Sequence, residues 1–210
     1  MARSAEDLFD KLQQGLVWRR KEISSAFVSA GQSDSIDRDA LYRAFWLLLY
    51  AHWEGFVKSA FEDYFKFVAS RKLKYGELQP NFLALKSSPL IRATDLLSRN
   101  ENQTLAFEML VGLESARFSE RRIPVDTKSN LSYKVLRMLE ITSGVDSTSF
   151  VEEDRLDKML LGRRNGIAHG EWLRVDRVDA EQMRTDTLEW MSQILNNISN
   201  AAVMKEYLRP

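Results

Sequence analysis

Apolar residues recur at the spacing of an α-helix along most of this chain, and few residues interrupt the pattern. Only 4 prolines occur in 210 residues. Leu8, Leu12, Leu16, Ile23 and Phe27, for example, recur roughly once per helical turn. No segment of useful length alternates apolar and polar residues as a half-buried strand does. The sequence therefore predicts an all-α fold, an up-and-down helical bundle with extra short helices.

Start and stop signals divide the chain into separate helices. Ser4, followed by Asp7, predicts a first helix that ends at Gly31. A long helix is expected over about 36–74, and its middle, 41–53, is apolar nearly all round, which is typical of the buried central helix of a bundle. Further helices are predicted from Ser88-Pro89, over 105–113, from Asn130 to Ile141, over 154–168 and from Asp179 to about 198, with 171–178 extended or irregular.

Composition and charge limit the class of protein. The chain has 30 Lys and Arg against 30 Asp and Glu, so its formal net charge is zero, and any nucleic-acid binding must use a local patch. Cysteine is absent, which excludes disulfides, thiolate nucleophiles and cysteine zinc sites. The N-terminus is charged, and the longest apolar run, 44–51, is far shorter than the ~20 residues that span a bilayer. We expect one soluble, cytoplasmic domain over residues 1–210.

One segment holds more residues suited to catalysis or phosphate binding than any other part of the chain: Arg-Arg-Asn-Gly-Ile-Ala-His-Gly-Glu at 163–171. It holds one of the 2 histidines, close to arginines, an asparagine and two glycines. An arginine fork suits phosphate oxygens, and a histidine, with a reference pKa of about 6.5, can donate or accept a proton near neutral pH. The sequence shows no glycine-rich phosphate loop and no pattern of metal-ligating histidines. We expect chemistry at this segment, without a metal or a cofactor.

Arg164 and His169, with Asn165 directly after the arginine, resemble the R-x4-6-H signature of the HEPN superfamily. The phrase Tyr-Ala-His-Trp-Glu-Gly-Phe-Val-Lys at 50–58 resembles one prokaryotic HEPN branch that is found beside restriction and other defence genes. The apolar segments 131–139 and 156–160, with Phe150 between them, stand ahead of the signature as in that branch. The resemblance covers about 41–172, most of the chain.

The resemblance implies a helical bundle that pairs as a homodimer, with the two signature helices facing each other across the two-fold axis. It also implies metal-independent cleavage of RNA, because active members of the superfamily are endoribonucleases and many act as toxins or antiviral effectors. Other members are catalytically inactive scaffolds, or toxins silenced by a partner nucleotidyltransferase. Family membership alone therefore leaves the activity open.

Cleavage of RNA without a metal needs few protein groups, because the ribose 2′-OH is the nucleophile. A base activates that hydroxyl, an acid protonates the 5′-oxygen, and a cation stabilises the pentavalent phosphorane. His169 is the predicted acid or base, Arg164 the predicted cation, and Asn165 the residue that orients the imidazole or the phosphate. The alternative roles are a salt bridge from Arg164 to Asp157, a histidine that stabilises a helix C-terminus, and a plain surface or capping amide.

The spacing of Arg164 and His169 raises a geometric difficulty. Residues five apart point about 140° away from each other on an ideal helix. The length of the arginine, a last turn loosened by Gly166 and Gly170, or a site that combines residues of two subunits would each resolve it. The sequence does not choose among the three.

Four further residues are candidates for contacting the substrate or for holding the catalytic residues in place: Arg163, Glu171, His52 and Glu54. For Arg163, which lies near the apolar line of its helix, and for His52, in the most apolar helix, we favour a structural role. Glu54 is costly to bury unpaired, so we expect it to pair with Arg43 or with a signature arginine.

The best local basic patch lies in the irregular stretch 117–130 and consists of Arg117, Arg121, Arg122 and Lys128. These cations are candidates for RNA contact, although most charge clusters are solvated surface. Trp172 directly follows the signature segment and is read as a core or dimer-interface anchor, with stacking on a base as the alternative.

The leading hypothesis is a homodimeric, metal-independent endoribonuclease of a prokaryotic toxin–antitoxin or antiviral defence system, with RNA as substrate and a cognate antitoxin or defence protein as partner. The alternative is a catalytically inactive HEPN dimer that binds a protein or a nucleotide. A third hypothesis is a toxin whose His169 region is modified by a cognate enzyme.

Overall fold

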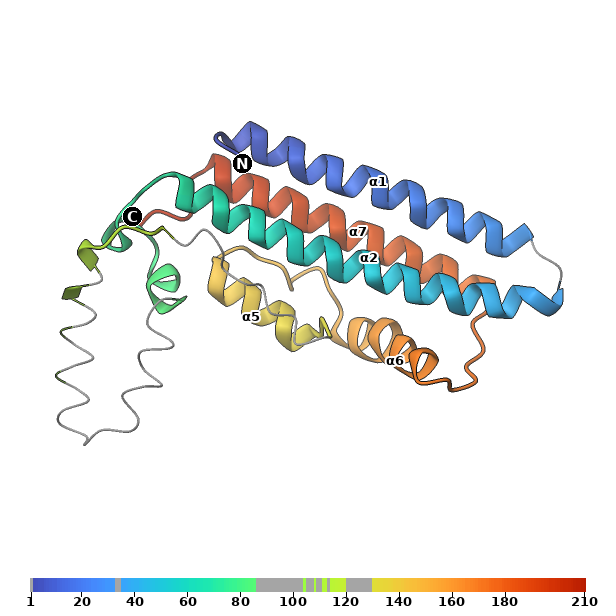
Figure 1. The fold of residues 1–210 in the computed structure, drawn as a ribbon. Helices are drawn as coiled ribbons and strands as arrows, with labels where there is room; N and C mark the ends of the chain where they lie inside the picture. The colour runs from blue at the N-terminus through green and yellow to red at the C-terminus, as the bar shows by residue number, and fades with distance from the viewer. Residues whose placement is uncertain are drawn as a thin grey trace.

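Three long helices lie side by side and form the body of the molecule: α1 (Ala5–Gln32), α2 (Ser35–Ser70) and α7 (Arg177–Val203) (Figure 1). The structure is a computed structural model that describes residues 2–32, 35–85, 104, 108, 111–112, 114–119 and 130–210. α2 contacts α1 and α7 on one side and the shorter helices α5 (Tyr133–Ser143) and α6 (Arg163–Ala168) on the other. The described residues are mostly helical and contain no β-strand beyond two isolated bridges, so the all-α fold class is confirmed.

α1 begins where the sequence predicts. The hydroxyl Oγ of Ser4 accepts a hydrogen bond from the Asp7 N–H at 2.9 Å, and the Asp7 carboxylate accepts one from the Ser4 N–H at 3.1 Å. This reciprocal pair satisfies N–H groups that have no partner within the first turn. The predicted apolar stripe Leu8, Leu12, Leu16, Ile23 and Phe27 is buried. The helix extends to Gln32, one residue beyond the predicted stop at Gly31.

α2 is shorter than predicted, because it ends at Ser70 and not near 74. Large side chains such as Trp46, Trp53 and Phe56 are fully buried, as expected for the central helix. One stripe of α2 is only partly covered by the described parts of the chain, however. It consists of Leu41, Ala44, Leu48, Ala51 and Gly55, among which Leu41 is 38% exposed and Ala44 and Ala51 are also exposed. We call this set the α2 stripe.

α5 begins at Tyr133, and its N-cap is Ser132 rather than the predicted Asn130. The Ser132 side chain accepts a hydrogen bond from the Val135 N–H, whereas the Asn130 amide is used elsewhere, as described below. Gly144 ends the helix in the left-handed conformation at φ 73°, as its position in the sequence predicts.

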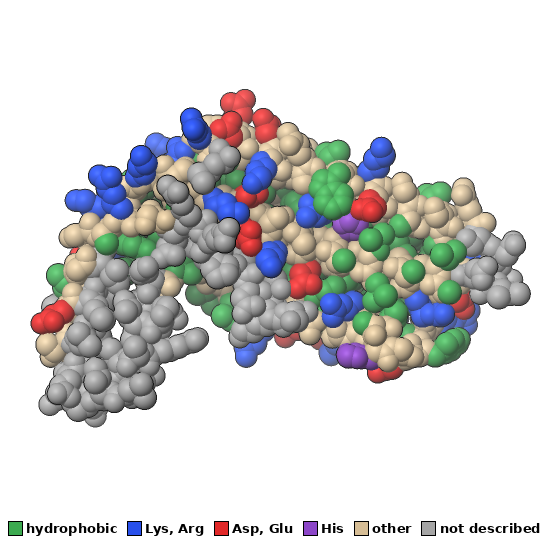
Figure 2. Space-filling model, viewed as in Figure 1, with side chains coloured by type: hydrophobic (Ala, Val, Ile, Leu, Met, Phe, Trp, Pro, Cys, Tyr) green, Lys and Arg blue, Asp and Glu red, His purple; other side chains and the backbone are tan. Residues whose placement is uncertain are grey.

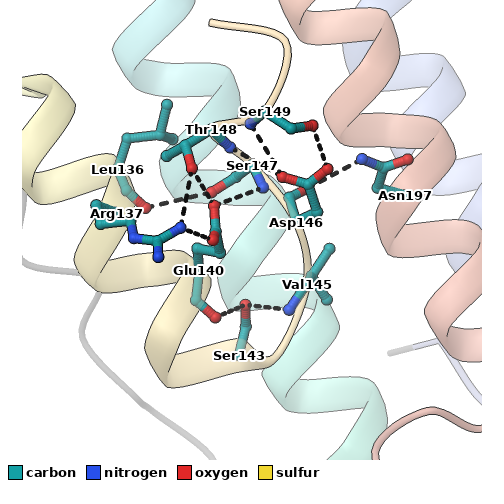
Figure 3. A network of polar contacts seen from close by, with 10 residues as sticks. All are labelled: Leu136, Arg137, Glu140, Ser143, Val145, Asp146, Ser147, Thr148, Ser149 and Asn197. Carbon is teal, nitrogen blue, oxygen red and sulfur yellow. Dashed lines mark hydrogen bonds and ion pairs between the residues drawn. The ribbon is translucent and has the colours of Figure 1, made fainter. Parts of the chain in front are cut away.

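The loop that follows α5 is held by a network of polar contacts (Figure 3). The Glu140 carboxylate accepts from the Ser147 N–H at 3.2 Å and from the side chains of Arg137 and Thr148. The Asn197 side chain of α7 donates to the Asp146 carbonyl at 3.0 Å. These contacts fix the loop between α5 and α7, and the loop leads directly into the helix that carries the signature.

The sequence predicts one helix over 154–168, but the structure is not α-helical over that whole range. Its first part, η2 (Arg155–Gly162), is a π-helix, and α6 continues from it without a break. α7 begins at Arg177 with Asp176 as N-cap, since the Asp176 side chain accepts from the Asp179 N–H at 2.9 Å. Asp179, the predicted cap, forms an ion pair with the signature segment instead.

Other predicted elements fall outside what the structure describes. The helix predicted from Ser88-Pro89 does so completely, and the helix predicted over 105–113 does so for most of its length. The irregular segment expected after the signature is confirmed over 171–176. In the described ranges, no helix combines the length and the apolar character that crossing a membrane requires.

Candidate active site

The signature segment is attached to α2 by a contact to the π-helix. A π-helix pairs each N–H with the carbonyl five residues earlier and is rare, and such turns are frequent at functional sites. The buried Trp46 indole N–H donates to the Leu160 carbonyl of η2 at 3.1 Å. Leu156 and Leu160 are themselves fully buried, so η2 is fixed to the core one turn before the signature begins.

Arg164 lies against α2 and is held by three groups. Its Cζ lies 4.5 Å from the centre of the Tyr50 ring, and its Nη1 donates to Asn130 Oδ1 at 2.8 Å and to Asn165 Oδ1 at 2.7 Å. No carboxylate in the described ranges forms an ion pair with it. The alternative salt bridge to Asp157 is not formed, because the Asp157 carboxylate accepts from the Tyr133 N–H at 2.7 Å. Arg164 is therefore a positioned cation that keeps its charge.

Tyr50 is the centre of this arrangement. Its hydroxyl oxygen accepts a hydrogen bond from the buried Leu131 N–H at 2.6 Å, which fixes the chain just before α5. Burial raises the pKa of Tyr50 to about 12. The hydrogen bond from Leu131 lowers this pKa in part, the charge of Glu54 adds to the rise, and the charge of Arg164 opposes it. Tyr50 is thus a neutral phenol at physiological pH, and it offers Arg164 an aromatic face without a counter-charge.

Arg163 points to a different partner from Arg164. Its Nη1 lies 2.6 Å from the Asp179 carboxylate of α7, and its Cζ lies 5.2 Å from the centre of the Trp46 ring. Trp46 and Tyr50 are one helical turn apart on α2, so the two consecutive arginines stack on two consecutive aromatic rings. Arg163 thereby links α6 to the start of α7, which agrees with the structural role favoured from the sequence.

His169 is the C-cap residue of α6, and its side chain is exposed. The Gly170 N–H donates to the Ile167 carbonyl at 3.1 Å and the Glu171 N–H to the Gly166 carbonyl at 2.9 Å, with Gly170 at φ 82°. This pair of bonds is the Schellman ending, in which glycine adopts the left-handed conformation cheaply. The imidazole has no hydrogen-bond partner in the described part of the chain, and no contact joins it to Arg164.

Gly166 allows the chain to fold back over α6. A Cβ at this position would lie 2.6 Å from Leu173 Cδ1 and 2.9 Å from Glu171 Oε2, closer than real side chains approach. Glu171 is therefore brought next to the signature, over the glycine between Arg164 and His169. The predicted loosening of the last turn is not seen at Gly166, which is helical, and the turn ends regularly at Gly170.

Comparison with known proteins adds one match. The family model described as HEPN_MAE_28990-like HEPN matches residues 8–207. The chain belongs to the HEPN superfamily. No curated protein and no solved structure matches it. HEPN domains are often ribonucleases and commonly dimerise, which supports an RNA-related function at a coarse level.

His52 lies on the other side of the α2 stripe from the HEPN signature. It is 6% exposed, packs edge-on against the Trp18 ring at 5.2 Å, and has Nε2 3.2 Å from Glu22 Oε2, although this contact lacks hydrogen-bond geometry. Burial lowers the pKa of His52, Glu22 opposes that effect, and Arg19 adds to it. Figure 2 shows histidine side chains at two separate places on this face of the molecule. The structure therefore does not bring His52 and His169 together.

The other predicted site residues of the HEPN chain are dispersed. Arg117 is exposed near the end of α2, and Arg121, Arg122 and Lys128 lie outside the described residues. Trp172 is 75% exposed, so it is not a core residue of the single chain. Among the described residues, Glu54 forms no ion pair with Arg43 or with a signature arginine, and its charge acts on the pKa of Tyr50. No described group of three or more His, Asp or Glu side chains is arranged to hold a metal ion.

Two residues that hold Arg164 were not among the predicted site residues. Tyr50 was quoted only as part of a family phrase, and Asn130 only as a helix cap. Tyr50 carries a usable signal, because it stands four residues after Trp46 on the apolar helix and an aromatic pair at this spacing presents two rings to one side. Asn130 carries none, since its contact with Arg164 joins residues 34 positions apart.

Proposed function

We propose that this HEPN protein is a metal-independent endoribonuclease of a prokaryotic toxin–antitoxin or antiviral defence system. In this proposal it cleaves RNA at a homodimer interface, Arg164 binds the scissile phosphate, His169 transfers protons, and Asn165 orients the guanidinium. A cognate antitoxin or defence protein controls the activity. The proposal rests on the signature residues and on the contacts that hold them.

The observation that carries the proposal is the difference between Arg164 and its neighbour Arg163. Asp179 neutralises Arg163, whereas amide oxygens and an aromatic ring hold Arg164. A guanidinium held in this way keeps its full charge and has further N–H groups to offer a phosphate. His169, exposed at the end of the same helix, is free to reach a substrate.

The α2 stripe supports a site shared by two subunits. Small and apolar residues on an exposed helix face favour close packing against another helix. If the two-fold axis runs perpendicular to α2, the paired α2 helices are antiparallel, and both α6 helices lie on the same edge of the interface. Each Arg164 then faces the signature of the partner. Such an assembly resolves the 140° divergence of Arg164 and His169 on one helix.

The proposed reaction transfers no electrons and needs no added reactant. One histidine removes the proton of the ribose 2′-OH, and the 2′-oxygen attacks phosphorus and forms a new P–O bond. Arg164 stabilises the charge of the phosphorane. The bond from phosphorus to the 5′-oxygen breaks, and a protonated histidine gives that oxygen its proton. The products are a 2′,3′-cyclic phosphate and a 5′-hydroxyl end.

The first test is cleavage of single-stranded RNA by the purified protein in the presence of a chelator. We expect loss of cleavage in Arg164→Ala and in His169→Ala, and retention in Arg174→Ala, which removes an exposed arginine close to the segment. End-group analysis should show the cyclic phosphate. Equal cleavage by all four proteins would assign the activity to a contaminant and refute the proposal.

A mixed dimer tests the shared site. Combining Arg164→Ala and His169→Ala subunits leaves one intact site per mixed dimer if each site takes its arginine and histidine from different subunits. Random pairing then restores about a quarter of wild-type activity. If each site takes both residues from one subunit, the mixture stays as inactive as its parents, and the shared-site part of the proposal fails.

The alternative, a catalytically inactive HEPN dimer that binds a protein or a nucleotide, is favoured by one observation. Arg164 Nη1 is already used by two amides, as in a purely structural contact. Growth on induced expression separates the two functions. A ribonuclease should arrest growth and His169→Ala should not, whereas a binding module should give the same growth in both.

A further inference from the structure

A cavity lies where α2 ends, far from the signature helix. Its volume is about 640 Å³, and it lies between the last turns of α2, the N-terminal segment and the segment that precedes residue 120. The residues lining it are Arg3, Lys66, Ala69, Ser70, Arg71, Lys72, Arg117, Phe118 and Ser119. We call it the Phe118 pocket. Figure 2 shows Lys and Arg side chains gathered at the end of the molecule that carries the N-terminus and the end of α2.

The charge of the Phe118 pocket is positive, and most of its cations form no ion pair with a described residue. Five of the nine lining residues are Lys or Arg, and none is acidic. Within the described ranges only one of the five, Lys66, forms ion pairs, at 3.4 Å to Glu62 and 3.8 Å to Asp63. Asp63 is already bound more closely by Lys11, at 2.6 Å. In a chain with a net charge of zero, such a concentration of cations creates a local field that attracts anions.

Arg71 is held in place over the pocket. Its guanidinium lies 4.7 Å from the centre of the Phe67 ring, and its Nε and Nη2 donate to Ser70 Oγ at 3.3 and 3.1 Å. Nη2 also donates to the Arg3 carbonyl, which connects the N-terminal segment to the end of α2. A cation fixed in this way loses little conformational freedom when it binds a phosphate.

Lys72 adopts a backbone conformation that normally favours glycine. Its φ is 56°, in the left-handed region, and its N–H donates to the Ala69 carbonyl at 3.2 Å as the chain leaves α2. Glycine is the usual residue at such a helix ending because it has no Cβ to strain. Lys72 therefore carries a backbone strain that glycine would not, and its side chain lines the pocket.

The floor of the pocket is apolar and is held by backbone hydrogen bonds. Phe118 is buried, and its N–H donates to the Leu73 carbonyl at 2.8 Å. The Tyr75 N–H donates to the Ala116 carbonyl at 3.0 Å, so the segment around Phe118 is paired with the chain that follows α2. A cationic rim over an apolar floor suits a ligand that has phosphates and a flat or apolar part.

We infer that the Phe118 pocket binds single-stranded RNA through its phosphates and anchors the strand away from the site of cleavage. The inference rests on the proposed function. The volume falls in the ~300–1,000 Å³ range of small-ligand sites and accommodates a nucleotide unit. Lys66 is 16 residues after Tyr50 on α2, which places the pocket about 24 Å from the Arg164 contact along the helix. Only a strand of several nucleotides reaches both.

The orientation of α2 supports this arrangement. At 100° per residue, Lys66 and Ala69 lie on the same side of α2 as Ala51 and Gly55 of the α2 stripe. The pocket therefore opens on the face where the proposed dimer brings the signatures together. A strand that leaves the interface along this face meets the pocket without crossing the core.

The chain offers a matched control for the test. Lys205 is a second lysine in the left-handed region, at φ 55°, and it does not line the pocket. Lys72→Gly and Lys205→Gly each remove one charge and relieve the same backbone strain, so both should raise the melting temperature. Only Lys72→Gly removes a cation from the pocket.

Binding is measured with full-length protein carrying His169→Ala, so that the RNA stays intact. The probe is a fluorescent single-stranded RNA of about 12 nucleotides, within the ~4–16 nucleotide range of single-strand sites. We expect Lys72→Gly, alone and with Arg117→Gln, to weaken binding several-fold. The slope of log affinity against log salt should fall by about 0.7 per lost phosphate contact. Lys205→Gly should change neither. Equal binding by the Lys72 and Lys205 variants would overturn the inference.

Two further arms separate the possible failures. A nucleoside triphosphate should displace the RNA only weakly, even at high concentration. Full displacement at low concentration would show that the pocket binds free nucleotides and would refute its role in anchoring an RNA strand. With histidine restored, Lys72→Gly should cleave a dinucleotide as fast as wild type and a long RNA less efficiently. Wild-type protein that cleaves no RNA refutes the proposed function, whereas the binding experiment still decides on the pocket.

Discussion

Replacing Tyr50 by phenylalanine separates the two roles of this residue. The change keeps the ring on which Arg164 stacks and removes the hydroxyl that accepts the Leu131 N–H at 2.6 Å. Leu131 is fully buried, so water cannot replace the lost acceptor of its N–H. Leaving a buried donor unpaired costs about 1–3 kcal/mol. Tyr50→Leu additionally removes the cation–π contact, which contributes ~0.5–2 kcal/mol more.

Urea unfolding followed by circular dichroism measures these losses. We expect the free energy of unfolding to fall in the order wild type, Tyr50→Phe, Tyr50→Leu, with the melting temperature falling by ~2–4 °C per kcal/mol in a domain of this size. Tyr133→Phe is the control, because the Tyr133 hydroxyl has no hydrogen-bond partner in the described part of the chain. Tyr50→Phe should also keep more RNA cleavage than Tyr50→Leu. An unchanged midpoint in Tyr50→Phe would show that the hydroxyl does not hold the chain before α5 and would refute the reasoning.

Three further changes test the surroundings of the signature. Gly166→Ala places a methyl group 2.6 Å from a leucine side chain, so thermal denaturation should show a loss of about 1–3 kcal/mol, whereas Gly112→Ala, with open space around it, should show none. Burial lowers the pKa of His52 in the folded protein. As the pH drops below about 6.5, the unfolded chain is therefore protonated at His52 while the folded protein is not, and the free energy of unfolding falls. Between pH 8 and pH 5, the urea midpoint of His52→Gln should therefore fall less steeply than that of wild type. Parallel plots of midpoint against pH for the two proteins would contradict this. Asp157→Ala removes the acceptor of the Tyr133 N–H and should cost ~0.5–2 kcal/mol in the same unfolding assay, without lowering RNA binding.

Helix positions could be predicted from the sequence because they depend on local spacing and caps. Ser4 and Gly144 carry their signals within three or four residues, and as expected Ser4 begins α1 and Gly144 ends α5. Asn130 and Asp179 carry the same kind of signal, yet their side chains bind arginines of the signature segment. A cap residue competes for several partners, and tertiary contacts decide which one it takes.

The π-helix could not be predicted from the sequence, because nothing in the apolar spacing of 155–162 distinguishes it from an α-helix. Asn165 was predicted to orient the imidazole or the phosphate, and its side chain instead accepts a hydrogen bond from Arg164. The exposure of the α2 stripe was not anticipated, since an apolar face has the same pattern whether its own chain or a partner covers it. That residues 1–210 form one domain stays a prediction, which the family match over 8–207 supports.

The wide turn of η2 determines the direction in which the side chains of the following helix, α6, project. An α-helix advances by about 100° per residue and a π-helix by less, so deleting a single residue between Arg155 and Gly162 without a change of winding would rotate Arg164 off the Tyr50 ring. The signature sequence would be unchanged, but the guanidinium of Arg164 would face water. Whether a chain with an intact arginine–histidine pair can function thus depends on the length of the segment before it.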